Sequence, residues 1–136
     1  MKKERHQEVL KEVLDEVESA LNDVNGLIAH QRRLAFSLSL GAVNLLELYF
    51  HNLTIMKEGS AIDHTWFKRK KENAFAKLQK QITSPINSIK DIDIFVDIIR
   101  KIEEKRDDLA YGAPATEEVL QEKINLFFKL REMLKC

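Results

Sequence analysis

The chain has 136 residues, the usual size of one domain, and its 44% apolar residues are enough to build a hydrophobic core. Charged residues make up 32%, glycine and proline are scarce, and the formal net charge is zero. This composition favours long helices over strands and turns. It excludes a global positive field that would attract nucleic acid or an anionic membrane, so any such binding depends on a local patch.

Several features predict a soluble cytoplasmic protein that forms one domain over residues 1–136. The only cysteine is Cys136, so no disulfide can form within the chain, which is typical of a reducing compartment. The first residues, MKKERHQEV, lack the apolar run of a signal peptide. The longest uncharged stretch lies between Arg33 and Glu47 and is shorter than the roughly 20 residues that span a bilayer. We therefore expect no membrane association.

The first two predicted helices differ in how many apolar faces they carry. Residues 3–25 place apolar side chains along one face at helical spacing. Residues 30–53 carry two nearly opposite apolar stripes: Leu34, Leu38, Ala42, Leu45 and Tyr49 in one, and Phe36, Leu40, Val43 and Phe50 in the other. Such a helix lies at the centre of a bundle or contributes to a subunit interface. The simpler interpretation is a central helix, and the same pattern predicts a homodimer that buries Phe36, Val43 or Phe50.

Three further helices are predicted in the rest of the chain. A loop over residues 54–63 precedes a third helix at 64–81, and a fourth helix covers 91–110. Thr116 is the expected N-cap of a fifth helix, with acidic residues in its first turn. No segment has a convincing strand pattern. The predicted fold class is all-α, an up-and-down bundle of four to five helices.

Motifs for metal, cofactor and nucleophile chemistry are missing from the sequence. The four histidines are not spaced to share a helix face and have no HExxH or ExxH pattern, so we interpret them as scattered surface or cap residues: His6, His30, His51 and His64. There is no glycine-rich phosphate loop and no GxSxG elbow. We therefore expect no metal and no cofactor.

A basic cluster, FKRKK at residues 67–71, has aromatic side chains beside it. Such a cluster can grip a phosphate backbone while the aromatic rings stack on bases. Because the net charge is balanced and one short basic run is common, we favour a solvated helix face with Trp66 and Phe67 in the core.

The most informative residue is Arg106, near the end of the fourth predicted helix. At about 100° per residue it falls inside the apolar stripe, almost under Ile99. A charge there costs several kcal/mol unless it is paired or lies in a cleft. One interpretation is a structural arginine paired with Asp107 or Asp108. The other is a sheltered guanidinium that binds phosphate.

The stretch RDDLAYGAP at residues 106–114, followed by a capped last helix, resembles the motif of the HEPN family. These small all-α domains are named for higher-eukaryote and prokaryote nucleotide binding. Their mark is an Arg, often followed by Asn or Asp, and a His several residues later. Arg106 and Asp107 match this pattern, whereas Tyr111 takes the place of the His.

The resemblance implies a symmetric homodimer in which two copies of the motif face each other across a cleft. Active members of the family are metal-independent endoribonucleases, often the toxin beside a small nucleotidyltransferase antitoxin. In them the Arg stabilises the scissile phosphate and the His moves protons. A tyrosine, with an ordinary pKa of about 10, is a poor base at neutral pH, so the resemblance implies weak or absent cleavage here.

These observations lead to one main hypothesis and two alternatives. The main hypothesis is a HEPN-like homodimer that binds RNA or a nucleotide through Arg106, Asp107 and Tyr111, paired with a nucleotidyltransferase. The first alternative is an active metal-independent endoribonuclease in which Arg106 and Tyr111 are catalytic. The second is a helical protein–protein interaction module without a ligand.

Overall fold

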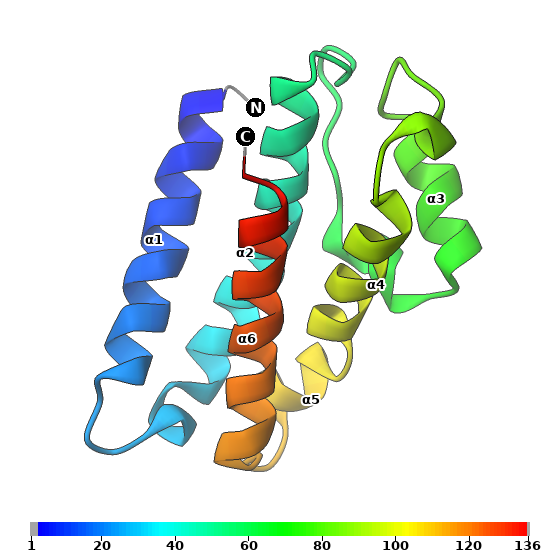
Figure 1. The fold of residues 1–136 in the computed structure, drawn as a ribbon. Coiled ribbons are helices and arrows are strands. Elements are labelled where there is room, and N and C mark those ends of the chain that lie inside the picture. Colours follow the sequence, from blue (N-terminus) through cyan, green and yellow to red (C-terminus); the bar gives the residue numbers. More distant parts are fainter. Residues whose placement is uncertain (1–2, 136) are drawn as a thin grey trace.

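The computed structural model describes residues 3–135 and contains only helices as regular secondary structure in that range (Figure 1). The elements are α1 (Lys3–Leu21), η1 (Leu27–His30), α2 (Gln31–Asn52), η2 (His64–Lys68), α3 (Lys71–Gln79), η3 (Ile86–Ser88), α4 (Ile92–Glu103), α5 (Arg106–Tyr111) and α6 (Glu117–Met133). An isolated antiparallel bridge joins Met56 and Ile82. The all-α prediction is confirmed.

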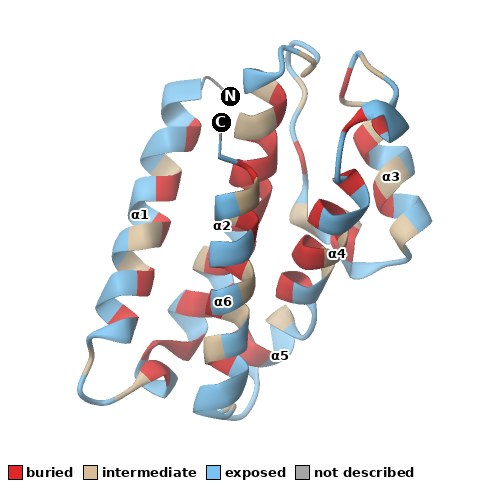
Figure 2. Ribbon diagram, viewed as in Figure 1, coloured by how far each residue is buried: buried red, intermediate tan, exposed pale blue. Residues whose placement is uncertain are grey.

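Helix α2 lies at the centre of the bundle, in contact with α1, α4, α5 and α6. Along the chain, α1, α2, α4 and α6 run alternately down and up, and α3 lies outside them (Figure 1). Buried residues follow the inner sides of these helices (Figure 2). By length and composition alone, Leu27–Asn52 could cross a membrane, and 67% of its most apolar stretch is buried inside the fold. The prediction of a central helix is confirmed.

A glycine in α2 lets two other helices approach closely. A Cβ atom built at Gly41 would lie 2.7 Å from Cε1 of Phe127 on α6 and 2.9 Å from Cγ1 of Val13 on α1. Both distances are shorter than side chains tolerate. Glycine at this position therefore permits the present spacing of α1, α2 and α6.

Two of the predicted helices are interrupted. The helix expected at 64–81 divides into η2 and α3, and the helix expected at 91–110 ends at Glu103 and resumes at Arg106. At the second break Lys105 has a left-handed backbone with φ of 61°. The Lys123 ammonium on α6 donates to the backbone carbonyls of Lys101 and Glu104. These contacts satisfy acceptors that the interrupted helix leaves free, and α5 can begin in a new direction.

Polar side chains hold the ends of the bundle together. Gln31, at the start of α2, donates to the carbonyls of Leu109 (3.0 Å) and Ala113 (3.2 Å) and accepts from the Ala115 amide (2.8 Å). This buried amide fixes the turn between α5 and α6. Thr116 caps α6 by accepting from the Val119 amide, as predicted.

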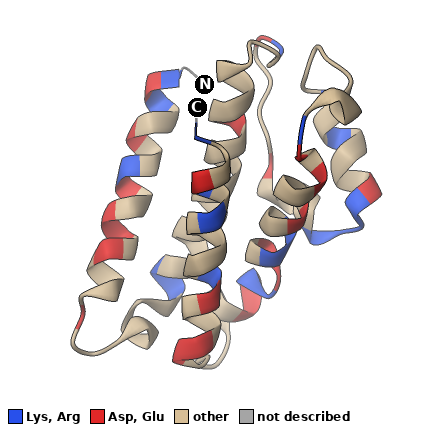
Figure 3. Ribbon diagram, viewed as in Figure 1, with Lys and Arg blue, Asp and Glu red and all other residues tan. Residues whose placement is uncertain are grey.

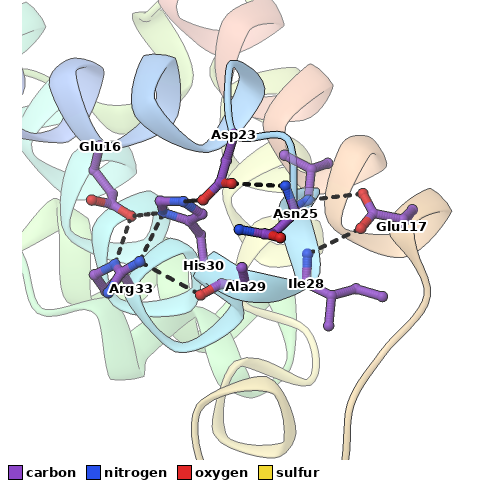
Figure 4. A network of polar contacts seen from close by, with 9 residues as sticks. Glu16, Asp23, Asn25, Ile28, Ala29, His30, Arg33 and Glu117 are labelled. Atoms are coloured by element: carbon purple, nitrogen blue, oxygen red, sulfur yellow. Dashed lines mark hydrogen bonds and ion pairs between the residues drawn. The ribbon is translucent and has the colours of Figure 1, made fainter.

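The acidic first turn of α6 has a second role. The Glu117 carboxylate accepts hydrogen bonds from the backbone amides of Leu27 (3.0 Å) and Ile28 (3.1 Å), at the start of η1 (Figure 4). Negative charge at both helix starts offsets their amide dipoles. The contact ties the α1–α2 connection to α6.

The interpretation of the histidines as surface or cap residues is wrong for His6, and it holds for His30 only in its position, the N-cap of α2. His6 is fully buried, with Nδ1 2.7 Å from Asn44 Oδ1 and Nε2 3.1 Å from Glu47 Oε2. His30 is 6% exposed and joins two carboxylates from α1 and the turn after it, as Figure 4 shows. Polar neighbours that are distant in sequence make their burial tolerable.

Candidate functional site

The site contains Arg106, whose side chain is 15% exposed at the first residue of α5. Its Nη1 donates to Asp107 Oδ1 at 3.1 Å, and its Cζ lies 4.9 Å from the centre of the Phe36 ring. Its Nε lies 3.9 Å from Glu103 Oε1, beyond hydrogen-bond distance, and is buried without a hydrogen-bond partner among residues 3–135. The inward position predicted for Arg106 is confirmed, although it lies on α5 rather than on a continuous fourth helix. Of the two predicted partners, Asp107 is the one that bonds to it.

A buried carboxylate connects Arg106 to two residues that sequence reasoning did not select. The Glu103 side chain is 1% exposed. Ser39 Oγ donates to Glu103 Oε2 at 2.7 Å, and His64 Nδ1 lies 2.6 Å from Glu103 Oε1. His64 and Arg106 thus approach the same oxygen of one carboxylate. The only local signal for this cluster is the three-residue spacing of Glu103 and Arg106.

One exposed aromatic ring lies against the guanidinium, and a second exposed ring lies against the first. Tyr111, at the end of α5, is 74% exposed and meets Phe36 edge-on, with ring centres 6.0 Å apart. Phe36 is 40% exposed and lies under Arg106. Tyr111 is therefore connected to Arg106 through Phe36 and presents its ring to the surroundings.

Arg106 lines two hollows on the surface. The larger, of about 740 Å³, lies between α2 and the segment that leads into η2; its lining is Phe36, Ser39, Leu40, Val43, Ala61, Ile62, Asp63, His64, Thr65, Trp66 and Arg106. The smaller, of about 470 Å³, is lined by charges of both signs, among them Lys68, Arg100 and Asp107. Trp66, expected in the core, is only partly buried and lines the larger hollow.

Asp107 belongs to the smaller hollow. Lys68 Nζ donates to its Oδ2 at 2.9 Å. This hydrogen bond, with a further one from Arg106, lowers the pKa of Asp107 below its ordinary value. Of the three residues predicted for the site, the structure brings Arg106 and Asp107 together and places Tyr111 at the edge.

The basic cluster at residues 67–71 does not form a separate positive patch. Phe67 is buried, Lys68 pairs with Asp107, and Lys71 pairs with Asp93 and Asp97. Basic and acidic residues alternate along the helices of the bundle (Figure 3). Residues 68–70 are exposed, as predicted, but the interpretation as a helix face is wrong for Arg69 and Lys70, which connect η2 to α3.

Within residues 3–135, no group of three or more His, Cys, Asp or Glu side chains is arranged to hold a metal ion. Comparison of the chain with protein-family models, with curated proteins and with solved structures found no match. The site around Arg106 consists of a sheltered cation, a buried carboxylate, an imidazole and exposed aromatic rings.

Proposed function

We propose that this protein is a HEPN-like domain that binds RNA, or a nucleotide, through the surface around Arg106. The observation that carries the proposal is the sheltered guanidinium that lines two hollows and lies over Phe36, whose ring in turn meets the exposed ring of Tyr111. Arginine binds phosphate through parallel hydrogen bonds. Exposed aromatic rings stack on the unpaired bases of single-stranded RNA. Both elements that such a ligand needs are adjacent here.

The contacts of Arg106 favour a ligand over a purely structural ion pair. Its buried neighbour Glu103 already has hydrogen-bonding partners in Ser39 and His64. The direct bond from Arg106 goes to Asp107, whose side chain is 57% exposed. Neither carboxylate depends on Arg106 alone, so its removal leaves no buried charge without a partner.

We further propose a homodimer, and we revise the surface that it uses. Val43 and Phe50 are 7% and 0% exposed within one chain, so the prediction that they are buried between subunits is wrong. The exposed members of that stripe are Phe36 and Leu40, at 40% and 48%. A dimer through these residues places the two copies of Arg106 near each other, as the family resemblance implies.

Light scattering of the purified protein tests the dimer. We expect a dimer mass at micromolar concentration and a monomer mass for Leu40→Ser, because that change removes apolar area from the interface. Ser37→Ala on the same helix is the control. A wild-type monomer at high micromolar concentration would contradict the dimer.

The resemblance also implies a small nucleotidyltransferase as a partner, and we retain this as part of the proposal. The test is to co-express the protein with a nucleotidyltransferase encoded beside it and to measure whether the two co-purify at a fixed ratio. Absence of such a neighbouring gene, or failure to co-purify, removes the partner without affecting RNA binding.

Binding of fluorescently labelled single-stranded RNA, followed by anisotropy, tests the main proposal. Arg106→Leu should weaken binding roughly 10- to 150-fold, the loss of a charged hydrogen bond worth about 1.5–3 kcal/mol. Arg5→Leu, which removes an exposed arginine on α1, is the matched control and should bind like the wild type.

Urea unfolding of the same variants completes the test. If Arg106 binds a ligand, Arg106→Leu should change the free energy of unfolding by less than about 1 kcal/mol, since leucine extends the apolar surface there. A loss of about 3–5 kcal/mol with unchanged RNA binding is the result expected of a buried structural pair, and it would overturn the proposal. Absence of RNA and nucleotide binding by the wild type would do the same.

A further inference from the structure

His64 lies near Arg106, and one of its two ring nitrogens, Nδ1, contacts the Glu103 carboxylate. Its Nδ1 lies 2.6 Å from Glu103 Oε1, and the Glu103 side chain is 1% exposed. A carboxylate next to Nδ1 keeps a proton on that nitrogen, which leaves Nε2 as the proton acceptor. Among the contacts of residues 3–135, Nε2 of His64 has no hydrogen-bond partner. The His64 side chain is 31% exposed and lines the larger hollow together with Arg106.

We propose that His64 is the catalytic group that moves the proton when an RNA phosphodiester bound at Arg106 is cleaved, and that Glu103 is a positioning residue for its ring. This inference rests on the proposed RNA binding and adds a reaction to it. It assigns the proton transfer to a residue 42 positions before Arg106 in the chain, rather than to Tyr111.

The pairing of His64 with Glu103 resembles an imidazole held in one tautomer by a buried acid. Such a partner fixes the ring orientation and stabilises the imidazolium that forms during proton transfer. Ser39 holds the second carboxylate oxygen through its 2.7 Å hydrogen bond, so the carboxylate cannot rotate freely. Ser39 is 2% exposed, so it supports Glu103 and does not present a nucleophile.

The reaction balances without any further reactant. Nε2 of His64 takes the proton from the ribose 2′-hydroxyl, and O2′ attacks the adjacent phosphorus. The new O2′–P bond forms as the P–O5′ bond breaks, and the imidazolium returns the proton to the departing 5′-oxygen. The products are a 2′,3′-cyclic phosphate and a 5′-hydroxyl, and Arg106 stabilises the charge that develops on the phosphoryl oxygens.

Because proton transfer is assigned to His64 and base stacking to Tyr111, a tyrosine in place of a histidine at position 111 does not prevent cleavage. Tyr111 lies at the edge of the site, with its contact to Phe36 at 6.0 Å between ring centres, and lines neither hollow. Its exposed ring is suited to stacking on a base next to the scissile phosphate. The expectation of absent cleavage considered only the residue at the motif position, whereas the fold supplies an imidazole from another segment.

The experiment measures cleavage and binding separately on the full chain. Cleavage is followed on a labelled single-stranded RNA of mixed sequence in the presence of EDTA. Binding is followed on the same sequence with 2′-O-methyl groups, which lack the nucleophile. The variants are His64→Asn, Glu103→Gln, Arg106→Leu and the control Arg5→Leu, each checked for its thermal unfolding midpoint. Asparagine keeps an amide donor toward Glu103 but lacks Nε2, and His64→Gln provides a second variant if the first fails to fold.

We expect the wild type to produce a 2′,3′-cyclic phosphate end. His64→Asn should lower kcat by about 100-fold or more, the usual contribution of general acid–base catalysis, while its Kd for the 2′-O-methyl RNA stays within about twofold. Arg5→Leu, the exposed control arginine on α1, should cleave like the wild type. Glu103→Gln should lower kcat more than it changes KM, as a residue that orients the imidazole does.

Two results overturn this inference and leave the proposed RNA binding standing. One is a wild type that binds the 2′-O-methyl RNA and cleaves nothing. The other is a His64→Asn variant that cleaves at the wild-type rate. A wild type that binds neither RNA overturns both the inference and the proposed function.

Discussion

Ser39 and Glu103 are 64 residues apart in the sequence, yet the Ser39 hydroxyl donates a 2.7 Å hydrogen bond to the buried Glu103 carboxylate. The contact joins the middle of α2 to the last residue of α4. It therefore fixes the point at which α4 ends and from which Arg106 begins the next helix. The same carboxylate holds His64, so one buried acid connects three parts of the chain.

Removal of the Ser39 hydroxyl should destabilise the protein. We expect Ser39→Ala to lower the free energy of unfolding by about 1–3 kcal/mol, because the buried carboxylate loses a donor. A double-mutant cycle with Glu103→Gln, measured by urea unfolding, should give a coupling of about 0.5–3 kcal/mol. Additive effects of the two changes would show that the hydrogen bond does not contribute to stability.

A methyl group at position 41 should force the central helices apart. Gly41→Ala improves helix propensity by about 1 kcal/mol, but its Cβ would lie too close to Phe127 and Val13. Overpacking costs about 1–3 kcal/mol, so we expect a net loss of up to about 2 kcal/mol. Thermal unfolding measures it, and Ser37→Ala in the same helix is the control. A higher midpoint for Gly41→Ala would show that the helices separate without cost.

The break between α4 and α5 should depend on Lys123. Lys123→Met keeps the aliphatic stem but removes the ammonium that donates to the carbonyls of Lys101 and Glu104. We expect a loss of about 1–3 kcal/mol and faster hydrogen exchange of the α5 amides. Lys129→Met, an exposed site on the same helix, should change neither. Unchanged exchange in α5 would show that the break forms without this contact.

His30 should stabilise the protein more at low pH than at high pH. Hydrogen bonds to Glu16 first, and then to Asp23, raise the pKa of His30 above its ordinary value of 6.5. The folded state therefore binds a proton more tightly than the unfolded state, and the contribution is complete below about pH 6.5 and is lost as the pH rises through the folded-state pKa. The difference in unfolding free energy between wild type and His30→Gln should be larger at pH 6 than at pH 9. Equal differences at the two pH values would contradict this.

His51 should make the protein less stable at low pH, the opposite of the effect of His30. Burial, and next the repulsion from His6, lower the pKa of His51 below 6.5. The unfolded chain then takes up the proton first, so stability is lost as the pH falls below about 6.5. His51→Leu removes this titration, and its urea midpoint should fall less than that of the wild type between pH 7.5 and pH 5. A parallel fall in both proteins would rule out this role of His51.

The resemblance to the HEPN family depends on a short motif. Its three residues, Arg106, Asp107 and Tyr111, lie in different surroundings in the structure. The inward position of Arg106 followed from the apolar stripe of the sequence and is confirmed. The bond between Arg106 and Asp107 was one of the pairings considered. The helix that carries Tyr111 ends within one residue of the predicted end at residue 110, whereas the exposure of the Tyr111 ring was not predicted.

The sequence by itself determined the helical class, the central place of the helix with two apolar faces, and the cap at Thr116. These features depend on residues a few positions apart, because a helix repeats every 3.6 residues and a cap bonds within one turn. Local spacing is therefore sufficient to predict them.

Only the tertiary structure decided the break before Arg106 and the meeting of His64 with Glu103. The break is satisfied by Lys123 from another helix, and His64 and Glu103 are 39 residues apart. A buried carboxylate is stabilised where several helices bring its hydrogen-bond donors together. The periodicity of the sequence does not predict such long-range contacts. The His64 imidazole therefore lies near Arg106 because of helix packing. It belongs to the site although it is not part of the sequence motif.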